Sequence, residues 1–146
     1  MKSIRVEGAG CVIQREVRIE WGDCDPAGIV YFPRYFAIFD NCTAGAFEAV
    51  GMPKPWLIRH YGIEGFPAVD IRANFHVPSR FGEDVLVETR IAEWGRSSFK
   101  VNHRLLKGGV LGVEGHEVRV WAGKDPAAPE RLKGMAVPDE VKARFG

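Results

Sequence analysis

Residues 22–33 read GDCDPAGIVYFP and place an acidic turn directly before a predicted helix. Asp25, Pro26 and Gly28 occupy the first, second and fourth positions of a type I turn, which favour these residue types. Pro26 also disfavours helical geometry at Asp25, so Asp25 should be extended. Pro33 suits the first turn of a helix, because the N–H that it lacks is not needed there. The stretch therefore predicts a fixed carboxylate just upstream of a helix N-terminus.

The predicted helix runs from about Pro33 to Val50, and Gly51 and Pro53 form a typical stop after it. Apolar side chains cover well over half of its circumference, which predicts a largely buried helix. Its N-terminus presents free backbone N–H groups and a partial positive charge. A carboxylate beside such donors suits attack on a carbonyl, since the donors can hold the oxyanion. On local grounds alone, a purely structural turn is the commoner interpretation.

Five segments alternate between apolar and polar residues and predict strands, at residues 16–21, 68–77, 84–94, 99–105 and 111–120. In the last segment the apolar phase changes, which predicts a β-bulge near Gly115. Residues 51–66 should form a loop that could contain a helical turn around 56–60. The segment after Trp121 should also be a loop, and a short helix should begin at Pro138. One long helix and five antiparallel strands indicate the α+β class, in a single domain over residues 1–146.

Composition and charge argue against several classes of function. Hydrophobic residues make up 46% and charged residues 27% of the chain, as in ordinary soluble globular proteins. A net charge of +1 argues against nucleic-acid binding, which usually needs a basic surface. Cys11, Cys24 and Cys42 are spaced like neither a disulfide framework nor a zinc site. We find no apolar stretch long enough to cross a membrane and no secretion signal, so the cytoplasm is the expected compartment.

The turn and the helix start resemble the signature of a known family. Residues 22–33, followed by Tyr35, are similar to hotdog-fold acyl-CoA thioesterases, and most similar to the 4-hydroxybenzoyl-CoA thioesterase branch. Residues 93–99 and 130–138 resemble two later segments of that branch. The resemblance implies a hotdog fold, in which a five-stranded antiparallel sheet wraps around one long helix. It also implies hydrolysis of an acyl-CoA thioester without metal or cofactor, by a homodimer with sites at the subunit interface, usually paired into a homotetramer.

The same resemblance assigns roles around the helix start. Asp25 matches the catalytic carboxylate, which acts as nucleophile or general base. The backbone N–H of Phe32 matches the donor that polarises the thioester carbonyl. The branch has a tyrosine at the Phe32 position, whereas here Tyr31 is its neighbour and is assigned to substrate binding. Asp40 matches the aspartate that meets the 4-hydroxyl of the aryl acid, although an aspartate on a polar helix stripe is the alternative.

The resemblance further implies that the CoA nucleotide lies against basic surface residues. Arg96 matches one of them, but its neighbours, basic in the branch, are Gly95 and Ser97 here. We assign Ser97 and Ser98, in the same turn, to substrate binding as well. Lys133 matches a basic position near the C-terminal loop. Solvated surface charges are the alternative reading for both basic residues.

Several alternatives remain open at this stage. His76 and His103 could each serve as a base, although both lie in alternating strands where structural histidines are common. Cys24 is better explained as a small packed side chain than as a nucleophile. The alternative functions are a thioesterase for short-chain aliphatic acyl-CoA and a non-catalytic acyl-CoA-binding module. The presence of Asp25 argues against the binding module.

Overall fold

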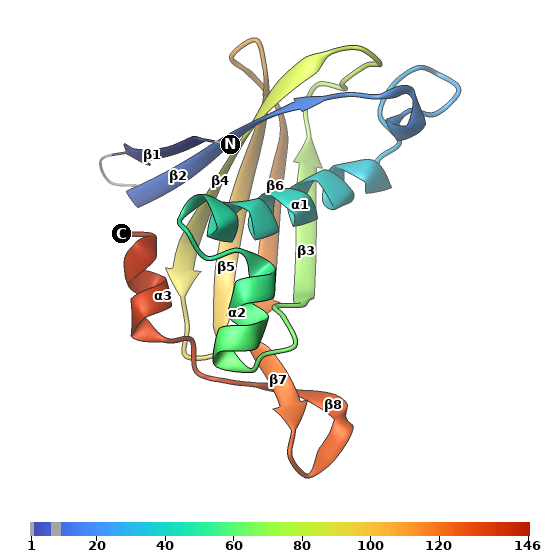
Figure 1. Ribbon diagram of the computed structural model, residues 1–146. Coiled ribbons are helices and arrows are strands. Elements are labelled where there is room, and N and C mark those ends of the chain that lie inside the picture. The colour runs from blue at the N-terminus through green and yellow to red at the C-terminus, as the bar shows by residue number, and fades with distance from the viewer. Residues whose placement is uncertain (1, 7–9) are drawn as a thin grey trace.

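The computed structural model describes residues 2–6 and 10–146, with side chains from Gly10 onward. Figure 1 shows the path of the chain through its elements. In chain order they are β1 (Lys2–Val6), β2 (Gly10–Arg18), the 3-10 turn η1 (Trp21–Asp23), α1 (Pro33–Ala49), α2 (Lys54–Tyr61), β3 (Ala68–Phe75), β4 (Asp84–Trp94), β5 (Ser98–Lys107), β6 (Val110–Val120), β7 (Ala122–Asp125), β8 (Ala128–Gly134) and α3 (Asp139–Arg144).

The main sheet is antiparallel, with the strand order β1-β2-β4-β5-β6-β3. The five predicted strands form β2-β4-β5-β6-β3, and β1 adds a sixth strand at one edge. The long helix α1 lies across one face of this sheet (Figure 1). The predicted α+β arrangement, one long helix against an antiparallel sheet, is therefore confirmed. At the other edge, β3 pairs with β6 and with no other strand among the described residues, which leaves its outer backbone groups available to another strand.

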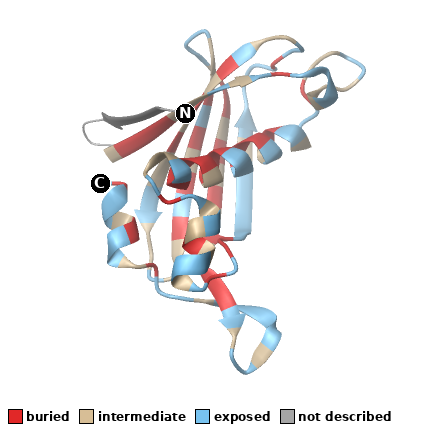
Figure 2. Ribbon diagram, in the orientation of Figure 1, coloured by how far each residue is buried: buried red, intermediate tan, exposed pale blue. Residues whose placement is uncertain are grey.

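Burial of α1 against the sheet explains why its apolar pattern covers so much of its surface. Figure 2 shows buried residues gathered on α1 and on the central strands. Phe47, from the second half of α1, packs against Phe66, Phe99 and Trp121. Each fully buried aromatic side chain contributes roughly 2–3 kcal/mol of hydrophobic stabilisation. This packing fixes the axis of α1 and with it the position of its N-terminus.

Two segments predicted as loops contain regular structure. Residues 54–61 form the complete helix α2, which begins after Pro53 and ends at Gly62 in the left-handed region, with φ of +67°. Residues 122–134 form the hairpin β7–β8. Its prolines obscured the strand pattern, but proline is tolerated in a two-stranded ribbon with free edges. In a third difference, Trp21 belongs to η1 rather than to a strand and is 65% exposed.

The predicted bulge of β6 is three residues away from its expected position. The register shifts at Gly112, which has no opposite residue between the pairs that β6 makes with Leu105 and Leu106. Gly115 stays in register opposite His103. Its missing side chain has a packing role, because a Cβ there would lie 2.6 Å from Cδ2 of Phe39.

The position of the bulge decides which residues of β6 face α1. Glu117 and Arg119 are buried, with 6% and 4% of their surface exposed, whereas Val118 and Val120 are only half-buried. The apolar pattern had indicated the opposite face for this half of the strand. The pattern failed because two charged residues occupy inward positions and neutralise each other there.

Candidate active site

The turn predicted at Asp25–Gly28 is present and orients the Asp25 carboxylate. Gly28 donates its N–H to the Asp25 carbonyl at 2.9 Å and has φ of +79°. Ala27 donates its N–H to Asp25 Oδ1 at 2.8 Å. Among the described residues, no donor contacts Asp25 Oδ2. The half-buried side chain therefore uses one oxygen to hold its orientation and leaves the other without a donor in this part of the chain.

A short two-stranded ladder connects this turn to α1. Asp25 donates its N–H to Ile29 at 2.9 Å, Cys24 bridges to Val30, and Tyr31 donates to the Asp23 carbonyl at 2.8 Å. The Asp23 side chain closes the base of the ladder. Its Oδ1 accepts from Arg34 Nε and Nη2 at 3.1 and 3.0 Å. The loop is thus fixed by backbone and ion-pair contacts that do not use Asp25 Oδ2.

Phe32 presents the predicted backbone donor at the start of α1. The residue has helical backbone angles, φ −53° and ψ −35°, so its N–H points the same way as those of the first turn. Tyr31 and Arg34 both use their N–H groups within the chain, at 2.8 Å each. The Phe32 N–H finds no acceptor in the part of the chain that the structure describes. It is therefore available to an external oxygen at the positive end of the helix.

Asp40 lies on the same stripe of α1 as this donor. Phe32, Phe36 and Asp40 follow one another at four-residue intervals, which places them on one face. Along the axis, Phe32 and Asp40 are separated by roughly 12 Å. The Asp40 side chain is 63% exposed, and its Oδ1 accepts from Arg119 Nη2 at 2.8 Å. Asp40 is therefore exposed on α1, as for a solvated helix aspartate, and it also has a specific partner in Arg119.

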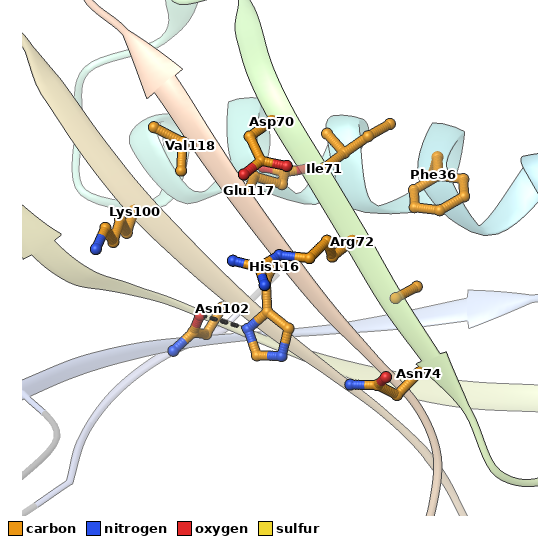
Figure 3. Close-up of a pocket in the computed structure, with 11 residues that line it drawn as sticks. Phe36, Asp70, Ile71, Arg72, Asn74, Lys100, Asn102, His116, Glu117 and Val118 are labelled. Atoms are coloured by element: carbon orange, nitrogen blue, oxygen red, sulfur yellow. Dashed lines mark hydrogen bonds between the residues drawn. The ribbon is translucent and has the colours of Figure 1, made fainter.

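Two cavities flank this stripe. A cavity of about 260 Å³ is lined by Phe32 and by apolar residues that include Phe75 and Val77. A hollow of about 630 Å³ follows β3, and Phe36 lies at its margin (Figure 3). Its polar wall carries a hydrogen bond of 2.9 Å between His116 and Asn102. The cavity beside Phe32 therefore offers apolar space next to the free N–H, whereas the hollow at Phe36 extends past β3 to the face of the sheet away from α1.

The predicted nucleotide-binding residues lie at the far end of the chain's sheet. Arg96 and Lys133 are both exposed, and the Arg96 carbonyl accepts the N–H of Val137, which follows β8, at 2.8 Å. The turn with Arg96 therefore lies beside the segment that follows β8. The loop that contains Asp25 follows β2, whose Arg18 pairs with Asp84 at the opposite end of β4. Because β4 spans 11 residues, its two ends are roughly 35 Å apart.

The other predicted contacts divide between these two ends. Tyr31 is 52% exposed next to the ring of Phe32. Ser97 and Ser98 are half-buried in the turn with Arg96, and the Ser98 carbonyl accepts the Gly95 N–H at 2.7 Å. One chain therefore brings Asp25, Tyr31, Phe32 and Asp40 into one region. It holds Arg96, Ser97, Ser98 and Lys133 in another.

Comparison with known proteins identifies the family. The model of the thioesterase-like superfamily matches residues 19–145, which include both of these regions. The chain belongs to the thioesterase-like superfamily. The predicted family and enzyme class, a thioester hydrolase, are thereby confirmed.

Relatives of this superfamily member share most of its length. It is 39% identical, over 86% of its own chain and 92% of the relative's, to the 4-hydroxybenzoyl-CoA thioesterase of Pseudomonas sp. strain CBS-3. A crystal structure of an aspartate-to-asparagine mutant of a 4-hydroxybenzoyl-CoA thioesterase, complexed with 4-hydroxybenzoyl-CoA, superposes with a TM-score of 0.85. Identity to it is 33%, over 92% of this chain and 99% of that one. The structure of a gentisyl-coenzyme A thioesterase gives a TM-score of 0.76 at 32% identity, over 91% and 98% of the two chains. These neighbours confirm the predicted hotdog fold.

The two histidines considered as alternative bases of this superfamily member, and the cysteine considered as a nucleophile, have hydrogen-bond or ion-pair partners within the chain. His103 is 1% exposed and contacts Thr89 at 2.8 Å and Thr43 at 3.2 Å with its two ring nitrogens. His76 is exposed and lies 3.3 Å from Glu114. The Cys24 thiol points to the Glu20 carbonyl at 3.6 Å. These contacts account for the three side chains without a catalytic role.

Sequence reasoning missed Glu117 and Arg119, which connect Asp40 to the core. Their signal is charge at alternate positions of a strand whose intervening residues are valines. Such a pattern ordinarily predicts a solvated face.

Among the described residues, no helix is both long and apolar enough to span a membrane.

Proposed function

We propose that this protein hydrolyses an acyl-CoA thioester and that 4-hydroxybenzoyl-CoA is its favoured substrate. One observation carries the proposal. Asp25 Oδ2 and the Phe32 N–H are both without a partner among the described residues, at the two ends of one short loop. A free carboxylate oxygen and a free amide donor at a helix N-terminus are the two groups that acyl transfer requires. The names of the relatives support the acyl-CoA class.

In the proposed mechanism, Asp25 Oδ2 attacks the thioester carbonyl carbon. The C–S bond breaks, CoA leaves as the thiolate, and a mixed anhydride forms on Asp25. Water then hydrolyses the anhydride to the free acid. The Phe32 N–H and the helix dipole stabilise the oxyanion, a contribution of roughly 3–4 kcal/mol for one such donor. In the alternative form, Asp25 removes a proton from the attacking water. Neither form requires a metal or a cofactor.

The acyl group is proposed to lie along the Phe32–Asp40 stripe. With its carbonyl oxygen on the Phe32 N–H, a para-hydroxylated ring would pass Phe36 and direct its hydroxyl to Asp40. The acyl carbonyl oxygen and the ring hydroxyl would each make a hydrogen bond of roughly 3 Å, to the Phe32 N–H and to Asp40. These two bonds and the ring between them fit the separation of Phe32 and Asp40 along the helix axis. Asp40 Oδ2 is the acceptor in this arrangement, since Oδ1 is bound to Arg119.

We further propose that the complete site needs a second copy of the chain. The loop with Asp25 and the basic residues Arg96 and Lys133 lie at opposite ends of the sheet, too far apart for one chain to serve both ends of the substrate. A two-fold axis across the free edge of β3 would bring them together. The exposed apolar residues Val69, Ile71 and Phe75 lie along this edge. The expected assembly is a cytoplasmic homodimer, paired into a homotetramer.

A substrate panel tests the proposed function. The panel contains 4-hydroxybenzoyl-, benzoyl-, phenylacetyl- and straight-chain acyl-CoA thioesters, and kcat/KM is measured for each. We expect the 4-hydroxybenzoyl thioester to be hydrolysed fastest. Faster hydrolysis of short aliphatic thioesters would assign the enzyme to the aliphatic class. Tight binding without turnover of any thioester would indicate a binding module.

A single turnover in oxygen-18 water distinguishes the two roles of Asp25. Water attack at the aspartyl carbon of the anhydride places label in the Asp25 peptide, which mass spectrometry detects. Because water can instead attack the acyl carbon, a parallel reaction with hydroxylamine traps the aspartyl anhydride as a hydroxamate. Label or hydroxamate on Asp25 supports direct attack. If the product forms at the normal rate and neither mark is found, the result favours the general-base role of Asp25.

A further inference from the structure

A group of polar side chains is buried beneath α1 and has no part in the proposed chemistry. Thr43 comes from α1, His103 from β5, and Glu117 and Arg119 from β6. They are 0%, 1%, 6% and 4% exposed. Burying a charged pair is costly unless its geometry is good and its remaining hydrogen-bonding capacity is satisfied. A cluster of this kind therefore needs a reason beyond stability.

Glu117 is the centre of the cluster. Its Oε1 accepts from Thr43 Oγ1 at 2.6 Å and lies 3.3 Å from His103 Nε2. Arg119 binds both of its oxygens, with Nε on Oε1 and Nη2 on Oε2 at 3.1 Å each. Burial alone would raise the pKa of Glu117, but the hydrogen bonds and charges of His103 and Arg119 outweigh it and lower the pKa to about 2. Glu117 is therefore a fixed anion at neutral pH.

This anion sets the orientation of Arg119. The guanidinium is planar, so two contacts with Glu117 fix its plane, and Nη1 donates to the Phe66 carbonyl at 3.2 Å. Nη2 has a second N–H, which points outward and donates to Asp40 Oδ1 at 2.8 Å. Arg119 thus connects a rigid buried cluster to a carboxylate that is otherwise 63% exposed.

The contact with Arg119 fixes the Asp40 side chain and leaves its second carboxylate oxygen, Oδ2, in a defined position. An exposed aspartate ordinarily samples several rotamers, and a charge-assisted hydrogen bond from a buried arginine restricts it to one. Within residues 10–146, no donor contacts Asp40 Oδ2. The exposed end of the cluster therefore presents one acceptor, on the stripe of α1 that begins at the Phe32 N–H.

We propose that Arg119, held by Glu117, is a positioning residue that makes the enzyme selective for hydroxylated aryl acyl groups, by fixing Asp40 as the acceptor for their hydroxyl. This proposal rests on the proposed function. An acyl group without the hydroxyl leaves Asp40 Oδ2 unpaired in the complex, and a site built to accept such a hydrogen bond discriminates against that analogue. A hydrogen bond to a charged group corresponds to a preference of roughly 10- to 100-fold.

The test measures kcat/KM for 4-hydroxybenzoyl-CoA and for benzoyl-CoA with four proteins: the unchanged enzyme, Asp40→Asn, Arg119→Lys and the double variant. Lysine keeps the buried charge opposite Glu117 but lacks the planar fork that reaches Asp40. We expect Arg119→Lys to lose most of the preference for the hydroxylated substrate, with benzoyl-CoA turnover kept within about twofold. In the Asp40→Asn background, Arg119→Lys should change the preference no further, because it acts through Asp40.

Two additional variants keep the test decisive. Arg104→Lys is the matched control, because Arg104 pairs with Glu88 at 3.3 Å on the other face of the sheet, and it should leave both rates unchanged. If Arg119→Lys does not fold, Glu117→Gln removes the charge that orients Arg119 and should give the same loss of preference.

The outcomes separate this inference from the proposed function. No hydrolysis of either thioester by the unchanged enzyme overturns the proposed function and the inference with it. Equal rates for the two substrates overturn the hydroxyl selectivity, and again the inference with it. A preference that Asp40→Asn removes and Arg119→Lys retains overturns the inference alone. So does an equal loss on both substrates in Arg119→Lys, which would show a purely structural role.

Discussion

Asp23 and Asp25 are two residues apart in one loop, yet their carboxylates are in opposite states of hydrogen bonding. Both oxygens of Asp23 are used, Oδ1 by Arg34 and Oδ2 by the Glu20 N–H at 2.9 Å. Asp25 uses only Oδ1, on Ala27. The loop thus contains one carboxylate with both oxygens bound and one with a free oxygen, which supports Asp25 rather than Asp23 as the proposed catalytic residue.

Asp25→Asn should lower kcat roughly 10²- to 10⁴-fold with 4-hydroxybenzoyl-CoA, because the amide is neither a nucleophile nor a base. Asparagine keeps an oxygen for the Ala27 N–H, so the loop should hold its shape. Binding of the intact thioester, measured by calorimetry, should therefore be retained. Asp23→Asn is the matched control and should mainly lower stability, through the weakened Arg34 contact. An equal loss of kcat in both variants would contradict the assignment.

A charge on the free edge of β3 should separate the proposed dimer. Ile71 is 48% exposed on this edge, and Ile71→Glu places a carboxylate where two copies would meet. We expect monomers in analytical ultracentrifugation and loss of most activity, since the basic end of the second chain is removed. Val110→Glu changes a residue that is 56% exposed at the β5–β6 hairpin, and it should leave the dimer intact. An active Ile71→Glu monomer would show that one chain is sufficient.

Gly115→Ala should destabilise the fold by about 1–3 kcal/mol, because the added methyl group overlaps the Phe39 ring. The Phe39 ring stacks on His103 with centroids 4.7 Å apart, so it has little room to retreat. The free energy of unfolding is measured in urea. Gly22→Ala, where a Cβ meets nothing within 4 Å, should be nearly neutral. Adding Phe39→Leu to Gly115→Ala should recover part of the loss, and the absence of any recovery would argue against this contact.

Acid should remove the stabilising effect of Glu117. Its pKa lies at about 2 in the folded protein, below the ordinary value of 4.5, so the folded state binds fewer protons than the unfolded chain. The contribution is therefore complete above about pH 4.5 and is lost as the pH falls toward 2. The stability difference between the unchanged protein and Glu117→Gln should shrink over this range in urea titrations. Glu93→Gln is the control, because the Glu93 side chain is 64% exposed, and its stability difference from the unchanged protein should stay small at every pH. A stability difference for Glu117→Gln that does not change with pH would be inconsistent with the buried ion pair.

Much of the site was predictable because its signals are local. Pro26, Gly28 and Pro33 restrict backbone angles within a few residues, so the turn and the start of α1 follow from their spacing. The long apolar pattern of α1 is equally local. The hairpin β7–β8 and the helix α2 were harder to predict, because prolines hide short elements that neighbouring segments stabilise.

The sequence by itself determined the family, the acidic turn, the buried helix and the antiparallel strands, since each depends on residue types at short separations. Only the tertiary structure decided which face of β6 carries the buried charges. That choice depends on the bulge at Gly112 and on the fit of Phe39 against Gly115, a contact between residues 76 positions apart. The connection from Glu117 through Arg119 to Asp40 likewise joins two distant segments, and no local pattern encodes such a pairing.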